Sequence, residues 1–180
     1  MNHISTEINN PTVSITPVVG VYDIRNSMIV AGSGGSLIYL VNNDPDNFVI
    51  VDRVYTNTIE SSATLPDTST FIQILMSRVL SSGTGTTLIA HNTNNSIIDV
   101  QPQTTILTNA TTSGGVELLR RYPDISRVYF QQPIIQNSDG IILGEGNNIE
   151  VFISTLSSSV VEIDMRFAIA SHEDLGLKGG

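Results

Sequence analysis

The sequence contains no cysteine and no tryptophan, and Lys178 is its only lysine. Without cysteine there can be no disulfide scaffold, no thiol nucleophile and no structural zinc site of the usual thiolate kind. Aromatic residues make up 6% of the chain, which leaves few rings for the stacked platforms that bind sugars. With 8 basic against 17 acidic residues and a formal charge of -9, the chain is not expected to bind nucleic acid through its phosphates.

Long hydrophobic runs are also absent. No apolar stretch approaches the length of about 20 residues that spans a membrane, and residues 1–10 lack the basic start and apolar core of a secretory signal. We therefore expect a soluble protein whose partners include neither a membrane nor a nucleic acid. At 180 residues, the chain is long enough for one domain with a sizeable core.

The residues that are abundant favour strands. Ile and Val together number 39, against 13 Leu and 6 Ala, and branched side chains suit the pleated surface of a sheet. The sequence therefore predicts an all-β protein.

The last third of the chain has the clearest pattern. Ile149, Val151 and Ile153 occupy alternate positions, and in residues 160–169 every odd-numbered residue from Val161 onward is apolar. Each run predicts a strand with one buried face, and the short polar segment at 155–159 (TLSSS) predicts that the two form an antiparallel hairpin. The glycine cluster GEGNN at 144–148 leads into the first of these strands. A phosphate-binding loop would lead into a helix, so we expect only a turn.

A second pair of apolar runs, LIYLV at 37–41 and FVIVDRVY at 48–55, is separated by NNDPDN. This cluster predicts a tight turn between adjacent strands. Asp44 and Asp46 could instead belong to a calcium loop, but the glycine and distant glutamate of an EF-hand are missing, which favours a plain turn.

Two segments are ambiguous. In FIQILMSRVL at 71–80 the apolar residues follow a helical period, whereas the surrounding chain reads as successive strands. VELLRRY at 116–122, stopped by Pro123, could form a helical turn within a longer loop. Within it, Arg120 and Arg121 are expected to form ion pairs in the chain or between subunits, in preference to an anion site.

No arrangement of reactive residues predicts catalysis. His3, His91 and His172 are far apart in sequence and lack the spacing of a shared metal site, and His91 is expected in a turn. GSGGS at 32–36 does not match the spacing of a serine nucleophile elbow and reads as a linker. No pair of carboxylates stands out as a catalytic pair. We expect no enzymatic activity, no cofactor and no metal.

Three segments resemble a group of tailed-phage virion proteins: GGSLIYLVNNDPDNFVIVDRVYTNT, TFIQILMSRVLSSGTGTTLIAHNTNNS and IILGEGNNIEVFISTLSSSVVEIDMRFAI. The resemblance covers roughly residues 34–170 and is one of pattern. It departs from these proteins in lacking a proline before the turn glycine at 144–146. It implies an antiparallel, jelly-roll-like β-sandwich in which 71–80 is a strand.

The same resemblance implies a function. These proteins are non-enzymatic and decorate or cement the capsid (head) of a tailed bacteriophage through subunit contacts. The implied partners are the major capsid protein or other virion proteins, with a homo-oligomer, by analogy a trimer. The implied location is the virion, assembled in the host cytoplasm. The alternative is a host-glycan or receptor-binding module of a fibre or tail tip.

The expected organisation has three parts. Residues 1–33, which contain Pro11 and Pro17, form an extended N-terminal arm and linker, residues 34–171 form the sandwich, and residues 172–180 form a C-terminal tail. The candidate interface residues lie on or near the arm: Val13, Ile15, Val18, Val19 and Tyr22.

Overall fold

The computed structural model describes residues 20–30, 34–61, 71–93, 102–122, 132–155 and 159–171. The main strands are β1 (Gly20–Val30), β2 (Gly35–Asn42), β3 (Asn47–Ser61), β4 (Phe71–Met76), β10 (Val116–Arg121), β11 (Gln132–Leu143), β12 (Asn148–Ser154) and β13 (Ser159–Ser171). Short strands between β4 and β10 are β5 (Val79–Leu80), β6 (Thr86–Thr87), β7 (His91–Asn92), β8 (Thr104–Thr108) and β9 (Thr112–Ser113). These ranges contain no helix, and hence none that could cross a membrane. The all-β prediction is confirmed.

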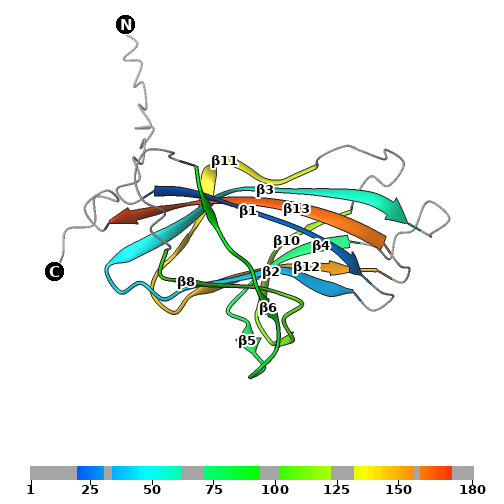
Figure 1. Ribbon diagram of the computed structural model, residues 1–180, viewed down its shortest axis with the longest axis horizontal. Helices are drawn as coiled ribbons and strands as arrows, with labels where there is room; N and C mark the ends of the chain where they lie inside the picture. The colour runs from blue at the N-terminus through cyan, green and yellow to red at the C-terminus, as the bar shows by residue number, and fades with distance from the viewer. Residues whose placement is uncertain are drawn as a thin grey trace, which may run out of the picture.

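Two antiparallel sheets stack in two layers (Figure 1). Sheet A has five strands in the order β11-β3-β13-β1-β7, and sheet B has six in the order β10-β4-β12-β2-β8-β6. The inward side chains of both sheets form one hydrophobic core, to which sheet A contributes Ile24 and Phe167 and sheet B contributes Leu40 and Ile74. Burial of these apolar side chains is the main force that holds the layers together.

The hairpin predicted for the last two strands is wrong, although both strands are present. β12 pairs with β2 and β4 in sheet B, whereas β13 pairs with β1 and β3 in sheet A. In the same way, the turn at 43–46 leads from β2 in sheet B to β3 in sheet A, so it joins the two layers and not neighbours in one sheet. Alternation identifies which face of a strand is buried, but it does not identify the neighbouring strand. A strand with one apolar face can bury that face from either of the two sheets.

The predicted turns themselves are confirmed. Residues 144–147 connect β11 to β12, and Gly146 has a φ of 72°, a conformation that costs glycine little. The Gly146 N–H donates to the Asn42 carbonyl oxygen at 2.8 Å, and the Asn42 N–H donates to the Asn147 carbonyl oxygen at 3.1 Å. The cluster GEGNN therefore serves to turn the chain against the end of β2.

Asn42 also ties this turn to the one at 43–46. Its side chain is fully buried, and its Nδ2 donates to the carbonyl oxygens of Asn47 and Leu143, each at 2.9 Å. Its Oδ1 accepts the Asp44 N–H at 2.9 Å. Asp44 Oδ1 in turn accepts the backbone N–H groups of Asp46 and Asn47. The carboxylate of Asp44 is thus used within the turn, as the plain-turn interpretation predicts.

β1 is an integral strand of sheet A. It pairs with β13 along its whole length, from Gly20 opposite Ile169 to Val30 opposite Ser159. The Tyr22 side chain is fully buried, and its ring stacks on that of Phe167 with centroids 5.3 Å apart. Two predictions are corrected: Gly20–Val30 belongs to the sheet and not to an arm spanning 1–33, and Tyr22 lies in the core and not at an interface. The ring of Tyr22 is buried within its own chain and is not available to a partner.

Residues 77–93 and 102–115, which we call the excursion, cover one side of the fold. Its strand β7 adds to β1 at the edge of sheet A, and β8 adds to β2 in sheet B, with β6 beyond it. Near β5 the excursion lies against the outer face of sheet B (Figure 1) and forms a second hydrophobic cluster. This cluster contains Tyr39, Leu107 and Ala110, with Val41 and Leu80 packed against them. β7 thereby covers the edge of β1 at Tyr22 and Asp23, and β8 covers the edge of β2 from Tyr39 to Asn42.

The two ambiguous segments both form strands. Residues 71–80 contain β4 and β5, separated at Ser77, whose φ of 56° breaks the extended chain. The strand implied by the resemblance is confirmed and the helical period was misleading. The helical turn considered for 116–122 is wrong, because Val116–Arg121 pairs with β4 as β10. In both cases pairing with neighbouring strands overrides the local pattern.

Candidate functional site

The free edge of sheet B is the first candidate site. β10 is the terminal strand of that sheet, with β4 on one side and no further strand on the other among the described residues. Val116 is 61% exposed, Leu118 48% and Tyr122 60%. An edge strand with exposed apolar side chains and unpaired backbone groups is a surface to which another chain can add.

A bulge gives this edge an unusual arrangement of charge. Glu117 lies opposite Leu75 of β4 and Arg120 lies opposite Gln73, with a shift in register between them. Residues 73 and 75 share one face of β4, so their partners Arg120 and Glu117 also share one face. In a regular strand, residues three apart would lie on opposite faces, and the bulge removes this difference. Arg120 Nη2 lies 2.7 Å from Glu117 Oε2, and Gln73 donates to the same carboxylate. The hydrogen bond from Arg120, followed by that from Gln73, holds the pKa of Glu117 below its usual value.

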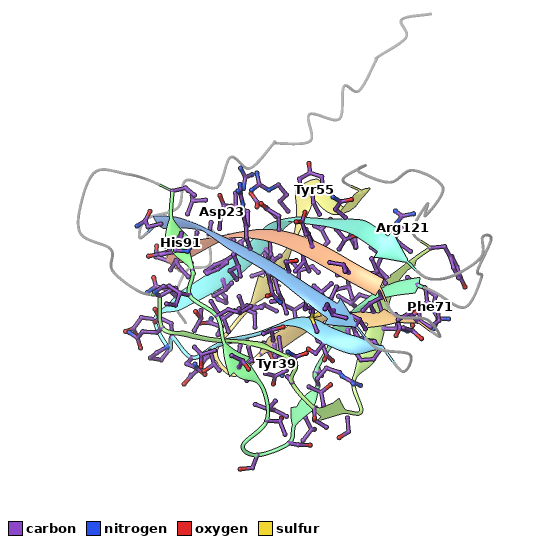
Figure 2. The ribbon with its side chains drawn as sticks, turned by 45° about the vertical axis from the view of Figure 1, so that its right-hand side comes forward. Asp23, Tyr39, Tyr55, Phe71, His91 and Arg121 are labelled. Atoms are coloured by element: carbon purple, nitrogen blue, oxygen red, sulfur yellow. The ribbon has the colours of Figure 1, made fainter. Side chains whose placement is uncertain are left out.

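Two aromatic rings complete this surface. The Arg120 guanidinium lies 4.3 Å from the centroid of the Phe71 ring, and the Tyr122 ring meets Phe71 edge-on at 6.1 Å. Such contacts hold exposed side chains in place before a partner arrives. We refer to Phe71, Val116, Glu117, Leu118, Arg120 and Tyr122 together as the β10 patch. Figure 2 shows its end of the molecule, where Phe71 and Arg121 are labelled.

The outer face of sheet A carries the second candidate, a network of ion pairs. Arg53 Nη2 donates to Asp23 at 2.9 Å and to Asp164 at 3.0 Å, and Arg25 Nε donates to Asp164 at 3.0 Å. Arg166 binds Asp52 through Nε and Nη2. Burial raises the pKa of Asp23 despite the attraction of Arg53. Opposite charges are mostly paired, which is typical of a solvated but ordered surface.

A depression of about 460 Å³ lies beside this network. Its walls include Arg25, Tyr55, Asn57 and Glu162, and Asn57 Oδ1 is buried without a hydrogen-bond partner in the described part of the chain. Figure 2 shows Tyr55 and Asp23 on this face and Tyr39 on the opposite side of the molecule. A hollow with a ring, a carboxylate and amides has the chemistry to hold a polar ligand such as a sugar.

A third polar cluster is structural. Glu150 is fully buried, and Arg78 Nε lies 2.7 Å from its Oε2, to which Thr112 Oγ1 also donates at 2.8 Å. Because Arg78 and Thr112 belong to the excursion and Glu150 to β12, the cluster fastens the excursion to sheet B. Burial, followed by the charge of Glu150, raises the pKa of the nearby Tyr39. The carboxylate is shielded from solvent and bonded to the excursion, so the cluster stabilises the fold.

The predicted site residues do not meet. Val13, Ile15, Val18 and Val19 lie outside the described residues, as do His3 and His172, and Tyr22 is in the core. His91 is exposed on strand β7 and not in a turn. Within the described ranges, no group of three His, Cys, Asp or Glu side chains could hold a metal ion. Ion pairs were expected for Arg120 and Arg121, and Arg120 forms one with Glu117.

The β10 patch was missed because its segment was interpreted as a helical turn. The signal available in the sequence was the combination of apolar Val116 and Leu118 with neighbouring charges of both signs. No known protein family matches the chain, and no curated protein is significantly similar to it.

Proposed function

We propose that this chain is a non-enzymatic structural protein with a jelly-roll fold, which decorates or cements the capsid of a tailed bacteriophage. The strand order supports the jelly roll. Without the excursion, the sheets reduce to β11-β3-β13-β1 and β10-β4-β12-β2. In this order β1 and β2 lie at one side, β10 and β11 at the other, and the chain changes layer between most consecutive main strands. Two interlocked Greek keys of eight strands have this arrangement, and they are common in viral capsid domains.

The observation that carries the functional proposal is the β10 patch. A monomer rarely leaves an edge strand with two exposed large apolar side chains, Val116 and Leu118, and a third, Tyr122, directly after it, because such an edge favours association. A protein whose task is assembly needs such a surface and no reactive residue. The partners would be the major capsid protein or other virion proteins, and copies of the same chain. The resemblance of residues 34–170 to phage virion proteins supports the same proposal, in which the chain belongs to the virion and is assembled in the host cytoplasm.

Replacing Leu118 by lysine tests the proposal. Leu118 is 48% exposed, so the fold should keep its stability within about 0.5 kcal/mol. If the patch joins neighbouring subunits on the shell, occupancy on purified particles at limiting protein should fall at least about tenfold, because each copy loses support from its neighbour. Occupancy is read by sedimenting particles and quantifying the bound chain.

The matched control is Ile89→Lys, because Ile89 is 65% exposed on the excursion, away from β10. This variant should bind particles like the wild type. Equal occupancy of the Leu118 variant and the wild type would remove the β10 patch from the proposal.

The depression on sheet A favours a second candidate, the glycan-binding module of a fibre or tail tip. Its ring and polar side chains suit a saccharide, although the chain has few aromatic residues. Titration with host saccharides decides between the two. Binding that is lost in Tyr55→Ala and kept in Leu118→Lys would favour recognition, whereas no binding at millimolar saccharide would exclude it.

A further inference from the structure

We infer that the occupant of the β10 patch is the same strand of a second copy, paired antiparallel about a two-fold axis. This inference rests on the proposed assembly function and names the partner at its interface. It replaces the trimer implied by the resemblance with a two-fold pair at this edge.

Charge complementarity selects the partner. Glu117 and Arg120 lie on the same face of sheet B because of the bulge between them. In an antiparallel pair of identical strands, one register places Glu117 opposite Arg120 of the second copy, and Arg120 opposite the second Glu117. The two ion pairs within the chains can then be exchanged for two between chains. Opposite charges placed directly across two strands stabilise their pairing, and like charges oppose it.

The same register aligns the apolar part of the patch. The bulge leaves Leu118 as an extra residue, so Leu119 of one copy faces Leu119 of the other at the two-fold axis, with Leu118 beside it, and Val116 faces the aliphatic stem of Arg121. Val116 and Leu118 are exposed in the single chain, and Leu119 is half-buried. Pairing in this way removes apolar surface from water on both copies at once, as an isologous interface requires.

Charges and a bulge on an edge strand commonly prevent pairing. Here the charges have both signs, and their positions distinguish among registers. A register that places Arg120 opposite Arg120 of the second copy brings two guanidinium groups together. A register that places Glu117 opposite Glu117 of the second copy brings two carboxylates together. The bulge also places Arg121 on the other face, opposite Ile72, which removes it as a partner for Glu117. These features therefore select one register instead of excluding every partner.

Analytical ultracentrifugation of the full chain tests the inference through charge exchange. The wild type should sediment with twice the mass of the 19.4 kDa chain. Glu117→Arg and Arg120→Glu should each raise the dimer dissociation constant at least about tenfold, because each creates two like-charge pairs. The double variant restores opposite charges and should return to the wild-type dimer. Glu145→Arg, an equal change of charge at the exposed β11–β12 turn, should have no effect.

Several outcomes would overturn the inference. These are a wild type that stays monomeric up to about 100 µM, single variants that dimerise like the wild type, and a double variant that stays monomeric although its urea midpoint matches that of the wild type. Deletion of residues 1–19 that abolishes the dimer, with the charge variants unaffected, would assign the contact to that segment instead.

The result can be separated from the proposed function. A monomeric chain whose Leu118→Lys variant still loses shell occupancy would refute the two-fold pair and retain the assembly function. A charge-dependent dimer that does not bind phage particles would refute the assembly function and retain the pair.

Discussion

Replacing Arg78 by methionine is expected to lower the free energy of unfolding by about 3–5 kcal/mol, because it leaves a buried carboxylate without its counter-ion. The Glu150 side chain has no exposed surface, and its Oε1 already lacks a hydrogen-bond partner within the described residues. Methionine retains the apolar stem of Arg78, so the loss reports the charge and its hydrogen bonds. Urea denaturation followed by circular dichroism measures the change.

Two further variants serve as controls for the Arg78→Met variant. Arg78→Met combined with Glu150→Leu removes both charges and should lose less stability than Arg78→Met alone. Arg25→Met removes an arginine whose side chain is 81% exposed in its pair with Asp164, and should cost less than about 1 kcal/mol. If Arg78→Met cost no more than Arg25→Met, the pair would not fasten the excursion to sheet B.

Replacing Asn42 by alanine is expected to cost about 3 kcal/mol, because it removes three buried or half-buried hydrogen bonds and leaves two carbonyl oxygens and one N–H without partners. These groups belong to Leu143, Asn47 and Asp44, at the ends of two turns that join the layers. The loss should be accompanied by faster proteolysis of both turns, since one side chain holds them together. Thermal and urea unfolding measure the stability.

The neighbouring asparagine is a matched control for this variant. Asn43 is exposed, and within the described part of the chain its side chain donates to Thr105 Oγ1 alone, at 2.9 Å, so Asn43→Ala should cost about 0.5 kcal/mol. Unfolding free energies of the two variants that agree within error would show that Asn42 is not the link between the turns.

Strands were easier to predict than their partners. Alternation in residues 160–169 correctly identified the buried side chains of β13, from Val161 to Ile169. It could not reveal that β12 lies in the other sheet, because a polar connection of a few residues suits both a hairpin and a crossing between layers. The two features differ in long-range pairing, which a local pattern does not encode.

The sequence pattern also could not predict which polar residues the excursion buries. The alternation of Ile149, Val151 and Ile153 leaves Glu150 on the other side of the strand, where it does point away from the main core, but Arg78 and Thr112 cover it. Asn42 gave no signal either, since one asparagine in NNDPDN resembles the others. Both residues depend on segments that are distant in sequence, and their roles emerge only when those segments are placed in space.

The β10 segment shows how a bulge can resemble a helix. A helix brings residues three apart together, and the bulge at Leu118 does the same for Glu117 and Arg120. A contact between residues three apart therefore does not by itself indicate a helix, because here it arises in a strand. This bulge also produces the charge pattern on which the proposed self-pairing depends.

A cryo-EM map of intact phage particles that contain this chain tests the central claim most directly. The account predicts regular copies on the icosahedral shell, with β10 of each copy lying antiparallel to β10 of another. Copies found only at a fibre or tail tip, or on the shell with β10 facing solvent in every copy, would contradict it.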